Sequence, residues 1–179
     1  MGCALALALL VPSAASAQLV DRYQSLARYM ESAGWRSARY DVATILSSDQ
    51  TPAHLKDHLE CMLPYLLEVE LGDALEEEPR EDLSAIARNL ERIDEAARGL
   101  IEAYPACSEG APEGVDPHAN AVRVQELSYA LPELEPIARP AREAADAERE
   151  GATTTGLAEV LLRQRAQVVT RIPNGPADA

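Results

Sequence analysis

The sequence contains no phenylalanine, a single tryptophan, a single lysine and three cysteines. A core must therefore be built from Leu, Ile, Val and Ala, with six tyrosines and Trp35 as its aromatic side chains. After Val11, no apolar run approaches the ~20 residues that a membrane-spanning helix needs. This absence predicts a mature chain without a stable membrane anchor.

Positive charge is also scarce, because 16 Lys and Arg stand against 30 Asp and Glu, for a net charge of −14. The negative electrostatic field of such a chain repels nucleic acids and anionic membrane surfaces, and it attracts cations and basic molecules. The composition therefore predicts no nucleic-acid binding. It favours a protein or small-molecule partner that is cationic, and it equally suits an acidic surface that keeps an exported protein soluble.

The first residues have the pattern of a secretory leader. The apolar run 3–11 is broken by Pro12, and Ala15, Ser16 and Ala17 supply the small side chains of a cleavage site. No basic residue precedes Cys3, so either the leader is atypical or the true start lies upstream. We expect a cleavable signal peptide over 1–17 and a secreted or periplasmic protein.

Removal of this leader would leave two cysteines, Cys61 and Cys107. In an oxidising compartment an even pair is most simply a disulfide, and its spacing is far too wide for a CxxC redox motif. Closing a loop of this length stabilises a fold by up to roughly 4 kcal/mol in the chain-entropy model. The sequence therefore predicts a Cys61–Cys107 disulfide.

The clearest helical pattern covers 79–104. Apolar residues recur at spacings of three and four, and charged residues occupy the other faces. Pro79 suits the first turn, and Pro105 is expected to end the helix. The members of the apolar stripe are Leu83, Ile86, Leu90, Ile93, Ala97, Leu100 and Tyr104.

A second helix is predicted from Thr51 as N-cap and Pro52 as first residue. Pro64 lies inside its apolar stripe and is expected to kink it, and Gly72-Asp73 is expected to end it.

In the C-terminal third, prolines recur every fourth residue at Pro132, Pro136 and Pro140. Each proline costs about 3 kcal/mol in a helix interior. We therefore expect a helix over 122–131, a break or tight corner before Pro140, and a new helix from there.

No segment shows the alternating pattern of a strand. The fold class is therefore all-α, an irregular helical bundle of about five to seven helices in one domain over 18–172. The remaining segments are helices over 19–34, 40–46 and 157–171, loops over 107–117 and 151–156, and a disordered tail over 173–179.

One cluster suggests metal binding. His54, His58 and Cys61 are spaced so that they share one side of a helix. Two imidazoles one turn apart can bind zinc or copper, with a third ligand from Cys61, Glu60 or His118. A disulfide would remove Cys61 as a ligand but bring the loop before His118 over this face. A plain boundary stripe of polar residues explains the same spacing.

Several enzyme classes are excluded by motif. There is no HExxH, CxxCH, GxSxG, P-loop or dinucleotide fingerprint, and no EF-hand spacing among the carboxylates. We therefore expect a non-catalytic binding, accessory or scaffold module, with divalent-metal binding through His54 and His58 as the alternative. An enzyme whose site is assembled from distant residues is a third reading that the sequence leaves open.

Overall fold

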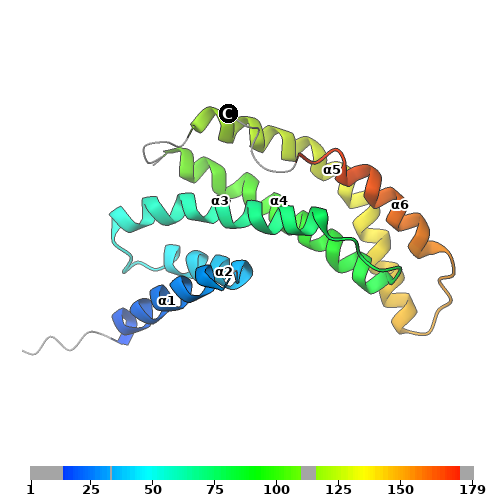
Figure 1. Cartoon of the computed structure of the whole chain (residues 1–179), viewed down its shortest axis with the longest axis horizontal. Helices are drawn as coiled ribbons and strands as arrows, with labels where there is room; N and C mark the ends of the chain where they lie inside the picture. The colour runs from blue at the N-terminus through cyan, green and yellow to red at the C-terminus, as the bar shows by residue number, and fades with distance from the viewer. Residues whose placement is uncertain (1–13, 33, 110–115, 174–179) are drawn as a thin grey trace, which may run out of the picture.

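The computed structural model describes residues 14–32, 34–109 and 116–173. These segments contain six α-helices and no strand, which confirms the predicted all-α bundle (Figure 1). The predicted tail, beyond Pro173, and the leader up to Ser13 lie outside the described residues. The helices are α1 (Ala14–Glu31), α2 (Trp35–Leu46), α3 (Ala53–Glu76), α4 (Leu83–Glu109), α5 (Pro117–Arg149) and α6 (Leu157–Val169).

Helix α4 is the centre of the bundle, because it packs extensively against both α3 and α5. The α1–α2 hairpin packs on α3, and α6 lies against α5 and α4 (Figure 1). Within the described part of the chain, no helix combines the length and hydrophobicity needed to cross a bilayer.

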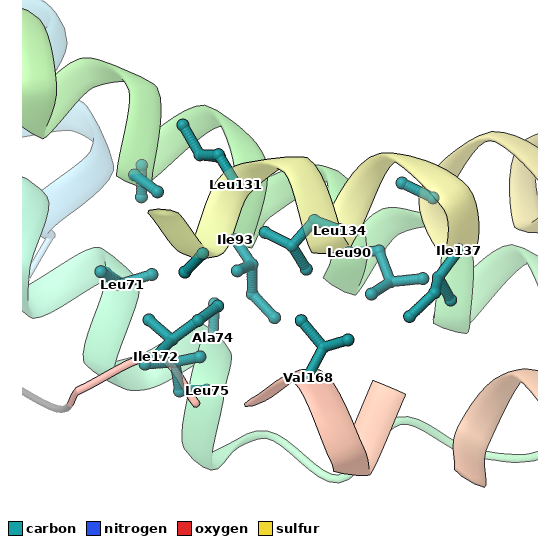
Figure 2. Close-up of a cluster of buried hydrophobic side chains, with 14 of the residues drawn as sticks. Leu71, Ala74, Leu75, Leu90, Ile93, Leu131, Leu134, Ile137, Val168 and Ile172 are labelled. Carbon is teal, nitrogen blue, oxygen red and sulfur yellow. The ribbon is translucent and has the colours of Figure 1, made fainter. Parts of the chain in front are cut away.

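The main core is formed where α3, α4, α5 and α6 meet. The predicted stripe of α4 is buried throughout, which confirms the orientation that its spacing indicated. A smaller cluster joins α1 and α2 to the first half of α3. Figure 2 shows side chains of the main core from all four helices and the residues after α6: Leu71, Ala74, Leu75, Leu90, Ile93, Leu131, Leu134, Ile137, Val168 and Ile172.

Two predicted helix starts are wrong in detail. The Thr51 hydroxyl donates to the carbonyl of Ile45, 2.6 Å away, so it closes the end of α2 and does not cap α3, which starts at Ala53. Helix α4 starts at Leu83 and not near Pro79. Its first turn is capped by Asp82, whose carboxylate accepts the backbone N–H of Ala85.

Two predicted helix ends are also wrong. Helix α3 continues through Gly72-Asp73 to Glu76, and α4 continues through Pro105 to Glu109. Pro105 is exposed, while Tyr104 and Cys107 on either side of it are buried. Packing of these neighbours outweighs the backbone hydrogen bond that the proline removes.

The end of α3 is set by Arg165 of α6, which is buried. Its guanidinium donates to the carbonyls of Ala74, Leu75 and Glu77 at 2.7–3.3 Å, and to Oδ1 of Asn89 at 2.7 Å. The last carbonyls of a helix lack partners within it, and a cation there is favourable. Arg165 therefore joins α6 to the end of α3 and to the first turns of α4.

The expected break between Leu131 and Pro140 is wrong, because α5 is one helix that contains all three prolines. Their spacing of four places them on one side, where Pro132 and Pro136 are exposed. The carbonyls that lose a partner there can accept from water, and the opposite side is buried in the core. The ribbon of α5 bends around that core (Figure 1).

Candidate functional site

The predicted disulfide is present between Cys61 of α3 and Cys107 of α4, whose Cα atoms are 4.6 Å apart. It joins the middle of α3 to the last turns of α4, across 46 residues of sequence. Cys61 is therefore engaged as half of a disulfide and is not a thiolate ligand.

The three histidines lie on two helices. His54 and His58 are in the first half of α3, and His118 is in the first turn of α5. The side chains of His58 and His118 are exposed, and that of His54 lies outside the described residues. Among the described residues, no group of three or more His, Cys, Asp and Glu could hold a metal ion. The metal site stays a prediction.

A buried polar network connects the three central helices beside the disulfide. Arg123 of α5, whose exposed fraction is 1%, donates from Nε and Nη2 to the two carboxylate oxygens of Glu68 of α3, at 2.7 and 2.8 Å. The Tyr104 hydroxyl of α4 donates to Oε1 of the same carboxylate at 2.8 Å. Such a paired geometry is what allows charges to be buried.

Two pKa shifts follow from this network. Burial and the adjacent Glu68 carboxylate raise the pKa of Tyr104 well above its usual range. Burial alone would lower the pKa of Arg123, but the hydrogen bonds and charge of Glu68 outweigh it and the pKa is raised. At neutral pH, Tyr104 is therefore a neutral donor and Arg123 is charged.

A pocket of about 430 Å³ lies over this network, between one face of α3, the end of α4 and the start of α5. We call it the disulfide pocket. Its walls are mostly apolar, and Tyr65, which is 56% exposed, stands at its rim. Its lining residues are Cys61, Pro64, Tyr65, Glu68, Val69, Tyr104, Cys107 and Asn120.

The orientation of the Asn120 amide is determined by its neighbours. The Ser108 hydroxyl donates to the carbonyl of Tyr104 at 2.9 Å, so the oxygen of Ser108 is an acceptor for Asn120 Nδ2, 3.1 Å away. No hydrogen bond within the described residues engages Asn120 Oδ1. The amide therefore brings a free acceptor to the pocket lining.

A larger hollow, of about 500 Å³, runs along α4 between α2 and α5. Its lining is dominated by charged residues, several of which are already paired with each other. Arg39 lies 2.8 Å from Glu95, and Arg98 lies 2.8 Å from Asp94. Exposed, paired charges of this kind are typical of a solvated surface, so the smaller, apolar disulfide pocket is the better candidate site.

Glu68, Arg123 and Asn120 were not predicted from the sequence, and Tyr104 was predicted only as a core residue. One sequence signal does point to Arg123. It stands four residues before Leu127 and occupies the position of an apolar residue on the buried face of α5. A charged residue in an apolar stripe requires a buried partner, but the sequence does not say which one.

No family model, curated protein or solved structure matches this chain. The roles of its residues therefore follow from its own geometry.

Proposed function

We propose that this protein is an exported, non-catalytic binding protein that holds a small, mainly apolar ligand in the disulfide pocket. The observation that carries the proposal is the combination of apolar walls with the buried, hydrogen-bonded network of Glu68, Tyr104 and Arg123 beneath them. Ligand sites in proteins are typically concave and mostly apolar, of ~300–1,000 Å³, with a few fixed polar groups. The pocket, at about 430 Å³, has these properties.

The absence of catalysis is supported by the protonation of the polar network below the pocket. Tyr104 and Arg123 both hold their protons firmly at neutral pH and both donate to Glu68. A general acid or base works best when its pKa lies near the operating pH. The network is better suited to fixing the shape of the pocket than to transferring protons.

Export is supported by the leader pattern over 1–17 and by the cysteine pair. A Cys61–Cys107 disulfide is stable in an oxidising compartment and rare in the cytosol. The net charge of −14 suits a protein that must stay soluble outside the cell.

The test is binding of a neutral apolar fluorophore, N-phenyl-1-naphthylamine, by the purified protein. Val69→Trp places a large side chain on the pocket wall. We expect it to weaken binding by about tenfold or more, equivalent to at least ~1.4 kcal/mol. Val160→Trp is the matched control, because Val160 is exposed on α6 and does not line the pocket.

Fluorescence titration measures the affinities, and circular dichroism confirms that both variants are folded. Equal binding by the wild type and a folded Val69→Trp variant would contradict the proposal.

A further inference from the structure

The described lining of the disulfide pocket offers more hydrogen-bond acceptors than donors. Glu68 Oε1 accepts from Arg123 and from Tyr104, but Oε2 accepts only from Arg123, so one acceptor site remains on it. Tyr104 uses its only donor on Glu68 and keeps its oxygen as an acceptor. Asn120 adds Oδ1 and one amide N–H. In the described lining, three acceptors on three helices therefore stand against one amide N–H, and the Tyr65 hydroxyl at the rim can donate or accept.

The charged groups around the pocket are likewise unbalanced, with negative charge in excess. Among the described residues of its lining there is no Lys, Arg or His, and the one carboxylate is that of Glu68. Arg123 also lies 3.8 Å from Glu126, whose side chain is 33% exposed and lies outside the pocket lining, so two carboxylates flank one guanidinium. The excess of negative charge disfavours an anionic head group and favours a cationic one.

The remaining walls determine the body of such a ligand. Pro64, Val69 and the disulfide are apolar, and Tyr65 at the rim offers an aromatic face. A cation beside an aromatic face is attracted by the ring, and an apolar body gains by leaving water.

We infer that the ligand of the disulfide pocket is a primary amine with an apolar or aromatic body. The inference rests on the proposed function, since it names the class of ligand for the same pocket. An ammonium group has three donors and no acceptor, which matches the three acceptors of Glu68, Tyr104 and Asn120. The apolar body lies against Pro64, Val69 and the disulfide.

The experiment compares three molecules with one body and different head groups: 4-phenylbutylamine, 4-phenylbutan-1-ol and 4-phenylbutanoate. Isothermal titration calorimetry of the purified protein at pH 7 gives their affinities. We expect the amine to bind about tenfold or more tightly than the alcohol, and the carboxylate to bind most weakly.

A pair of variants separates the local field of the pocket from the net charge of the chain. Val69→Lys places a cation on the pocket wall, and Val69 is only partly buried, so the lysine can reach water. Both ligands lose part of the apolar wall, but only the amine meets a like charge, so we expect amine binding to weaken about tenfold more than alcohol binding. Val160→Lys makes the same change in net charge on exposed α6 and should leave amine binding unchanged.

The outcomes distinguish the two proposals. Equal affinity for amine and alcohol, or equal weakening by Val69→Lys and Val160→Lys, overturns the amine inference while apolar binding in the pocket stands. Binding of the neutral fluorophore without any binding of the amine also overturns it. Failure of the fluorophore and of all three phenylbutyl compounds overturns the proposed function itself.

Discussion

Glu68→Ala is expected to lower the free energy of unfolding by about 3–5 kcal/mol, the cost of removing one partner from a buried ion pair. The side chain of Arg123 is 1% exposed and that of Glu68 is 11% exposed, so the variant leaves a buried guanidinium without its main carboxylate partner. The variant also leaves the buried Tyr104 hydroxyl without its acceptor. Urea denaturation followed by circular dichroism measures the change.

Two further variants identify the cause of that loss. Glu159→Ala removes half of an exposed pair with Arg163 on α6 and should cost less than about 0.5 kcal/mol. Glu68→Leu combined with Arg123→Leu removes both buried charges, and it should be more stable than Glu68→Ala because no unpaired charge remains. A loss below about 1 kcal/mol for Glu68→Ala would show that the network is not buried as described.

The second large effect is expected from the disulfide. Replacing Cys61 and Cys107 together by serine should lower the free energy of unfolding by up to ~4 kcal/mol, because the unfolded chain loses a loop constraint across 46 residues. Reductant should destabilise the wild type by a similar amount and leave the double variant unchanged.

Thiol counting provides an independent check on the disulfide. In the unfolded, non-reduced protein, an alkylating reagent should leave both Cys61 and Cys107 unmodified. Free reaction of both thiols, together with an unchanged denaturation midpoint in the double variant, would contradict the role of the disulfide.

Patterns in the sequence correctly predicted the features of the fold that depend on the residue types and spacing within a segment. The stripe from Leu83 to Tyr104 follows the period of a helix, and it is buried as that period requires. The Cys61–Cys107 pairing followed from the even number of cysteines that remain after the predicted leader. No strand pattern was present, and the described residues contain none.

The errors arise where distant residues override a local preference. The prolines of α5 predicted a break, but burial of Leu134, Ile137 and their neighbours on the opposite side maintains one helix. Gly72-Asp73 predicted the end of α3, but Arg165, some 90 residues later, caps carbonyls further along. A sequence pattern carries no information about such a partner.

The candidate site was missed for the same reason. Its residues come from the middle of α3, the end of α4 and the start of α5, and only the disulfide among them had a sequence signal. Glu68 and Asn120 look like ordinary surface residues until Arg123 and Ser108 are placed beside them.

The most direct test of the central claim, that the disulfide pocket is the ligand site, is to locate the ligand by NMR. The ¹⁵N-labelled protein is titrated with 4-phenylbutylamine, and the backbone amides and the Asn120 side-chain amide are followed. The largest shifts are predicted at Tyr65, Val69 and Asn120, with little change at Glu91 and Arg98 in the charged hollow. Shifts that gather in that hollow would contradict the claim.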